Sequence, residues 1–357
     1  MRSCTMQWAA TPRNRQRPEG LKMEVEREMN LTKKKDFNWG RFLVSWAAVF
    51  ALVLCFIMFT ALKGSAFMSS SNMVNILRAM SINTVFAIAA TVTMAPDGFD
   101  MSAATLASCS AYAFVSSFLW FGFSLPVCII ITILVTMVLY QLTMFLILVC
   151  KIPDMLATCA LMFVHQGLGQ WYIGGGAVST GMQTSWHTPP ARTALTDGFS
   201  AIGRAPWIII IMFACVLVAH IFLNYTKQGR YLYAMGGNKQ AAKLSGINTT
   251  KYRYMAGMIT AVFIAIAGIL VASRGSSAQV MCCDDYLMPS LAAVFVGRTV
   301  GGAEKPNPIG TMIGACLVST LENGLTILAV PFYVLPAVKG AVLALALIAA
   351  YATKKQD

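Results

Sequence analysis

Two carboxylates interrupt an otherwise apolar stretch of the chain, in the sequence APDGFDMSAA at residues 95–104. Asp97 and Asp100 lie there beside a proline and a glycine, residue types that break helices. Ionisable groups inside a membrane are costly and are usually functional, so the two aspartates are candidates for a solute or proton pathway. The alternative is a hairpin turn at the membrane surface. The residues by themselves favour neither.

Motifs for catalysis are absent from the sequence. The stretch GRTVGGAEK at residues 297–305 comes closest to a phosphate-binding loop, but it lacks the G-x-x-x-x-G-K-[ST] spacing. There is no H-E-x-x-H or G-x-S-x-G motif and no C-x-x-C pair, and most of the ten cysteines fall within apolar runs, where they act as small hydrophobes. We therefore expect no enzyme activity, no metal and no cofactor bound by this chain.

Apolar runs long enough to cross a bilayer dominate the sequence. Hydrophobic residues make up 57% of the 357 residues and charged residues only 11%, which excludes an ordinary soluble domain. We predict an all-α polytopic membrane protein of about ten transmembrane helices, some of them broken or re-entrant. The expected spans are 42–62, 80–96, 101–122, 125–149, 155–175, 206–225, 254–273, 287–297, 309–329 and 333–351.

Basic residues predict the orientation of these spans. With the N-terminus inside, the internal segments hold 21 Lys or Arg and the external loops hold five, as the positive-inside rule requires. The net charge of +13 therefore needs no nucleic-acid partner. We expect a disordered basic cytoplasmic tail at 1–41, a transmembrane domain at 42–352 and a cytoplasmic tail at 353–357. Both termini are then cytoplasmic.

The longest internal loop, 226–253, contains the sequence GRYLYAMGGNKQAAKLSGI at residues 229–247. Residues 236–238 predict a turn, and 240–245 predict a short helix across the cytoplasmic face. The alternative explanation for the positive charges of this loop is that they anchor it to lipid headgroups. The small residues of the loop favour a second explanation, because small side chains allow a partner to approach the backbone closely.

A second broken segment resembles the first in composition. Residues 292–315 and 87–111 each run from apolar residues through glycine and charge to small apolar residues. Paired broken segments hint at an internal repeat of the kind that transporters use to build a pathway. Within the last two spans, Glu322 and Lys339 are either an internal ion pair or part of a polar path.

These motifs together resemble the membrane permease subunits of bacterial ABC importers for monosaccharides, of the ribose, galactose and xylose type. The resemblance covers roughly residues 75–352, and its most specific part is residues 229–247. Weaker matches are Ser276–Gln279, the Asn323-Gly324-Leu325 step, Lys339 and Gly98–Ser102. Departures near the presumed pathway, such as Arg298 in place of a glycine, concern the substrate and leave the class intact.

The resemblance implies that the cytoplasmic loop contains a coupling helix, on which a separate ATP-binding subunit docks and through which ATP use drives transport. The coupling residues it implies are Gly229, Arg230, Gly236, Gly237, Asn238, Ala241, Ala242, Ser245 and Gly246. The implied pathway residues are Asp97, Asp100, Ser102, Asn323 and Lys339. Further implied partners are a periplasmic or lipid-anchored sugar-binding protein and a second permease copy, in the bacterial inner membrane.

Two other functions fit the sequence. A proton-coupled secondary transporter or facilitator would use Asp97, Asp100 and Glu322, and would work without any ATPase. A membrane scaffold or subunit without transport activity would show no uptake defect on deletion.

Overall fold

The computed structural model describes residues 46–185, 188–300, 305–331, 333–338, 340, 341 and 344. The helices are α3 (Ala47–Lys63), α4 (Ser70–Met94), α5 (Ala103–Leu119), α6 (Leu125–Leu148), α7 (Asp154–Tyr172), α8 (Asp197–Ile202), α9 (Trp207–Tyr225), α10 (Lys227–Gly237), α11 (Lys239–Leu244), α12 (Thr249–Gly275), α13 (Leu287–Thr299) and α14 (Pro308–Ile327), with a short 3-10 helix η1 (Asp284–Tyr286). A helix occupies each of the first nine expected spans. The tail at 1–41 and most of the tenth span, with Lys339, lie outside the described residues.

Four helices of the described chain, α4, α6, α9 and α12, are long and apolar enough to cross a membrane. The helices α3 and α5 are apolar but shorter. Two helices begin well before their predicted first residues, because polar residues cap them. Ser69 accepts a hydrogen bond from the backbone N–H of Asn72 and starts α4 about ten residues early, and Asn248 likewise starts α12.

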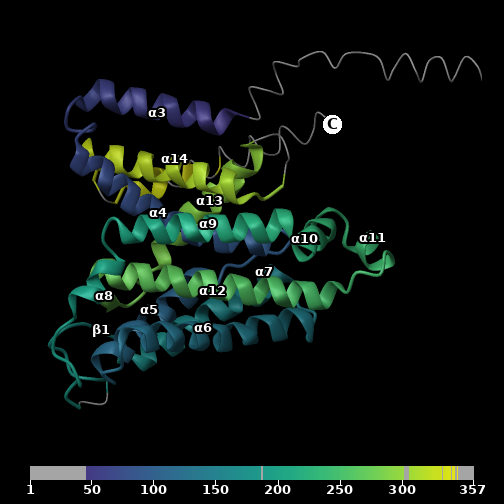
Figure 1. The fold of residues 1–357 in the computed structure, drawn as a ribbon, viewed down its shortest axis with the longest axis horizontal. Helices are drawn as coiled ribbons and strands as arrows, with labels where there is room; N and C mark the ends of the chain where they lie inside the picture. Colours follow the sequence, from purple (N-terminus) through teal and green to yellow (C-terminus); the bar gives the residue numbers. More distant parts are fainter. Residues whose placement is uncertain are drawn as a thin grey trace, which may run out of the picture. The chain divides into compact units, whose positions relative to one another are not determined.

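The centre of the helix assembly is α4. It packs against α9, α12, α13 and α14, while α12 continues the packing to α5 and α6. Figure 1 shows α3 beside α14 at one edge and α6 at the opposite edge. The apolar window of α4 is 78% buried and that of α6 only 22% buried, so α6 presents apolar side chains outward. An apolar outer surface around a packed interior suits a lipid environment.

A two-residue ribbon was not predicted. Strand β1 (Ala177–Val178) pairs antiparallel with β2 (Ala278–Gln279) and joins the segments that follow α7 and α12. It lies at the end of the helices opposite to α10 and α11 (Figure 1). Strand β2 is the end of the Ser276–Gln279 motif, so this motif forms a contact between segments that are distant in the sequence.

The loop at 226–253 contains two helices where one was expected. The predicted turn at 236–238 is wrong in detail, because Gly236 and Gly237 form the last turn of α10. Only Asn238 leaves the helical conformation, and its side chain accepts a hydrogen bond from the N–H of Ala241 to start α11. The predicted helix at 240–245 agrees with α11.

Candidate coupling site

Helix α10 begins at a tight bend after α9. Thr226 caps it by accepting a hydrogen bond from the N–H of Gly229 at 3.0 Å. A Cβ on Gly229 would lie 2.3 Å from the carbonyl oxygens of Phe222 and Leu223, so only glycine fits at this bend. The first coupling residue implied by the sequence therefore fixes the angle between α9 and α10.

The other end of α10 contacts the interruption between α4 and α5. A Cβ on Gly236 would lie 2.2 Å from the carbonyl oxygen of Ala95 and 3.4 Å from the amide nitrogen of Asp97. The absent side chain of Gly236 is what allows the two backbones to touch. Gly237, the next residue, has nothing within 4 Å of the corresponding position.

The same helix contacts the second interruption, between α13 and α14. The hydroxyl of Tyr233 donates a hydrogen bond to the carbonyl oxygen of Pro306 at 2.7 Å. Burial raises the pKa of Tyr233 to about 12, which keeps this hydroxyl protonated. Helix α10 therefore contacts both interruptions, and each interruption joins a pair of helices.

The two interruptions differ in how their flanking helices pack. Helices α13 and α14 lie closely together, with glycines at the contact: Cβ atoms on Gly297 and Gly314 would collide with the backbones of Gly310 and Ala293. Helices α4 and α5 make only a small contact with each other. The compositional similarity of the two segments therefore does not extend to the packing of their flanking helices.

Helix α11 presents a mixed basic and apolar surface. Ala242 is buried and faces the rest of the chain, whereas Leu244 is 89% exposed. Its neighbours Ala241, Lys243, Ser245 and Gly246 are exposed, as are Arg230 and Asn238. Leu244 was missed by sequence reasoning, because hydrophobicity alone does not show which side of a short helix faces outward.

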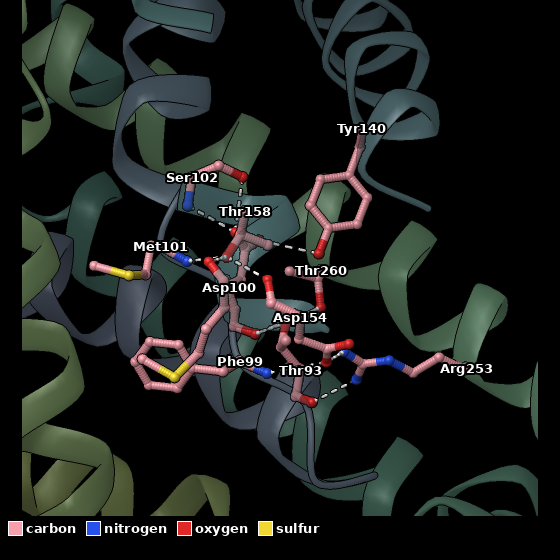
Figure 2. Close-up of polar contacts among 12 residues, drawn as sticks. Thr93, Phe99, Asp100, Met101, Ser102, Tyr140, Asp154, Thr158, Arg253 and Thr260 are labelled. Atoms are coloured by element: carbon pink, nitrogen blue, oxygen red, sulfur yellow. Dashed lines mark hydrogen bonds and ion pairs between the residues drawn. The ribbon is translucent and has the colours of Figure 1, made fainter. Parts of the chain in front are cut away.

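The predicted pathway carboxylate Asp100 lies in the loop just before α5, where it accepts hydrogen bonds from Ser102 and Tyr140 (Figure 2). Its Oδ1 accepts hydrogen bonds from the backbone N–H and the hydroxyl of Ser102, at 2.8 and 2.7 Å. Its Oδ2 accepts one from Tyr140 at 3.0 Å. Burial raises the pKa of Asp100, and the hydrogen bonds from Ser102 and Tyr140 oppose that rise. Asp100 and Ser102 thus hold the loop in shape.

An ion pair fixes the same loop from the other side. Arg253, at the start of α12, pairs with Asp154, at the start of α7, and also donates to the carbonyl oxygen of Thr93 at 2.9 Å. Asp154 accepts a further hydrogen bond from the N–H of Phe99 at 3.3 Å. The guanidinium lies directly against Gly98, where a Cβ would lie 1.9 Å from its Nη1. This ion pair was not foreseen, because its members are 99 positions apart.

The structure does not bring all the predicted pathway residues together. Asp97 is exposed with a positive φ of 61°, in the loop that Asp100 and Ser102 stabilise. Asn323 lies far along α14 from the end that contacts α10, and its Oδ1 is buried. The loop of Asp97 lies with the first turns of α7 and α12 and the end of α10. This placement fits the surface-turn alternative for residues 95–104.

Comparison with known proteins identifies the family of the chain. Residues 72–351 match the family described as branched-chain amino acid transport system / permease component. The ribose import permease protein RbsC of Haemophilus influenzae is 30% identical over 331 residues, covering 90% of this chain and 97% of that protein. RbsC of Bacillus subtilis is 29% identical, covering 91% and 98%. The xylose transport system permease protein XylH of Escherichia coli is 24% identical, covering 95% and 99%. No solved structure matches the chain.

Proposed function

The chain belongs to this family of transport permease components, and from that premise we propose that it is the permease subunit of an ABC importer for a monosaccharide such as ribose. The relatives' names supply the sugar: ribose for RbsC and xylose for XylH, each matched over most of its length. ATP hydrolysis belongs to a separate ATP-binding subunit, and no cofactor is bound by this chain.

The observation that carries the proposal is the pair of contacts made by α10. One helix outside the spans contacts the interruption after α4 at Gly236 and the interruption before α14 at Tyr233. The exposed basic and apolar surface of α11, next in the chain, provides the docking surface for the ATP-binding subunit. Movement of α10 and α11 by that subunit would shift both interruptions together.

We further propose a topology of ten spans in the bacterial inner membrane, with both termini in the cytoplasm. The charge distribution supports it, with 21 basic residues inside and five outside. A sugar-binding protein would then deliver solute at the β1–β2 end. Two copies of the chain would form the membrane pathway between them.

The proton-coupled alternative needs a carboxylate that is able to titrate within the pathway. Of the three carboxylates that this alternative would use, Asp100 accepts three hydrogen bonds, Asp97 is exposed beside α10, and Glu322 lies within α14. The family and the import permeases among the relatives favour the ATP-driven function.

Gentle purification of the full chain from native membranes tests the proposal. We expect an ATP-binding subunit to copurify, and uptake of ribose or xylose to stop when ATP is depleted while the proton gradient is kept. Arg230→Glu with Lys243→Glu, which reverses one exposed charge on α10 and one on α11, should release the subunit. Uptake that persists without ATP and collapses with an uncoupler would establish the secondary transporter instead.

A further inference from the structure

Two consecutive cysteines occupy the turn between β2 and η1. Cys282 and Cys283 are both free, and their Sγ atoms lie 3.9 Å apart. Successive side chains of an extended strand point to opposite faces, so this proximity comes from the turn. Met281, which precedes the pair, has a positive φ of 58°, and Cys283 has φ −109° and ψ −5°. The backbone therefore holds the two thiols side by side.

Two hydrogen bonds fix this turn on α5. The backbone N–H of Met281 donates to the hydroxyl oxygen of Tyr112 at 2.9 Å, and the N–H of Cys283 donates to Ser108 Oγ at 3.1 Å. Beyond the turn, η1 contacts α5 and leads directly into α13, which packs against α4 and α14. The turn therefore fixes where η1 and α13 begin relative to α5.

The two thiols differ in exposure and in acidity. Cys282 is partly exposed, whereas Cys283 is fully buried. The hydrogen bond with the Cys283 thiol lowers the pKa of Cys282, and burial raises the pKa of Cys283. Because the thiolate is the nucleophile in thiol–disulfide exchange, Cys282 is suited to attack an external disulfide and Cys283 to resolve the product.

We propose that Cys282 and Cys283 form a thiol–disulfide exchange site, at which a small-molecule disulfide such as glutathione disulfide converts them to a vicinal disulfide that slows transport. The Cys282 thiolate attacks one sulfur of the external disulfide, which forms a mixed disulfide and releases one thiol. Cys283 then attacks Cys282 Sγ, forms the bond between the two cysteines and releases the second thiol. The two cysteines lose two electrons and two protons, and the external disulfide gains them.

Oxidation must change the turn. The Sγ atoms have to approach from 3.9 Å to about 2.0 Å, and the peptide bond between the two cysteines becomes part of the ring that closes. The N–H of this peptide bond is the one that donates to Ser108. Closing the ring reorients the N–H and removes one of the two hydrogen bonds that fix the turn on α5. Since η1 and α13 follow the turn, their movement relative to α5 changes with it.

The vicinal disulfide should be readily reversed. Adjacent Cα atoms are about 3.8 Å apart, whereas the Cα atoms of most disulfides are at least about 4.4 Å apart. Such a departure from the preferred geometry makes a disulfide easier to reduce, which is typical of regulatory disulfides. The effect on transport rests on the proposed function, whereas the exchange chemistry does not.

The chemical test uses the full permease with its ATP-binding subunit in proteoliposomes, with glutathione disulfide as the oxidant. Alkylation and peptide mass spectrometry should show that Cys282 and Cys283 lose two hydrogens and take up no label, and dithiothreitol should restore both thiols. Cys283→Ser should instead retain glutathione on Cys282, because no resolving thiol remains. Cys282→Ser should react at least about tenfold more slowly, because Cys283 is buried. Equal reaction of the two single variants, or a bond from either cysteine to Cys109 of α5, would overturn the exchange site.

Uptake of D-ribose or D-xylose by the same proteoliposomes, with ATP and sugar-saturated binding protein, tests the effect on transport. Glutathione disulfide should lower wild-type uptake about fivefold, the factor that one lost hydrogen bond of typical strength produces, and dithiothreitol should restore it. The double variant Cys282→Ser with Cys283→Ser should transport equally with and without the oxidant. An unchanged rate in the oxidised wild type, or an equal loss in the double variant, would overturn the inference and leave the proposed function standing. A reduced wild-type complex that takes up neither sugar with ATP would overturn the proposed function, while mass spectrometry would still decide the exchange site.

Discussion

Gly236 of α10 and the carbonyl oxygen of Ala95 are so close that a single added methyl group would lie 2.2 Å from the oxygen. Ala95 follows directly after α4, the most buried of the four long apolar helices. The end of α10 therefore contacts, at Gly236, the residue that follows the helix at the centre of the assembly. Because no side chain lies between the two backbones here, a displacement of α10 should move the end of α4 with little deformation in between.

Gly236→Ala should uncouple the transporter. The methyl group must displace α10 from the 95–97 loop by close to 1 Å, since Cβ atoms lie at least about 3 Å from their neighbours, and packed interiors absorb such shifts poorly. We expect sugar uptake to fall at least about tenfold, with normal amounts of protein in the membrane. Gly237→Ala is the matched control, because nothing lies within 4 Å of its added methyl group. Equal uptake by the two variants would contradict the role of this contact.

Tyr233→Phe removes the hydrogen bond from α10 to Pro306 and leaves the ring in place. The carbonyl oxygen loses a partner in a partly buried position, which costs about 1 kcal/mol. We expect uptake to fall about threefold to tenfold and the ATPase rate without sugar-binding protein to rise, because the helix pair α13–α14 no longer follows α10. Tyr231→Phe is the control, since the ring of Tyr231 packs edge to face against Tyr252 and its hydroxyl bonds nothing in the described residues. A similar change in uptake and ATPase rate in both variants would contradict a specific role for the Tyr233 hydrogen bond.

Leu244→Ala should weaken binding of the ATP-binding subunit. The side chain of Leu244 is 89% exposed, and its full burial by a partner would contribute about 2 kcal/mol to binding. The dissociation constant of the subunit from detergent-solubilised permease should rise about 30-fold, with the fold unchanged by thermal unfolding. Lys243→Ala should change the same constant only a few-fold and make it less sensitive to salt. An unchanged constant for Leu244→Ala would mean that lipid covers α11.

The positions of the helices could be predicted from the sequence because apolar runs of sufficient length leave the backbone few other options in a membrane. The features that depend on contacts between distant segments could not. Arg253 looked like one more positive charge of an internal loop, yet it is buried against Gly98. Gly236 looked like a turn residue, whereas its role is close approach to Ala95. The resemblance pointed to residues 229–247 as a coupling segment, but only the packing shows which of these residues face inward.

Substitutions of Arg253 and Asp154 should have non-additive effects on the free energy of unfolding, because the two residues form an ion pair. Arg253 is largely buried, so Asp154→Asn leaves its charge without a counterion and should cost about 2 to 4 kcal/mol of unfolding free energy. Arg253→Met should cost a similar amount, because it strips Asp154 and the carbonyl oxygen of Thr93 of their donor. The double variant, measured by thermal unfolding in the same detergent, should be no less stable than the worse single variant, since neither charge is then left unpaired. Losses that simply add would show that the two residues stabilise the chain separately and do not act as a pair.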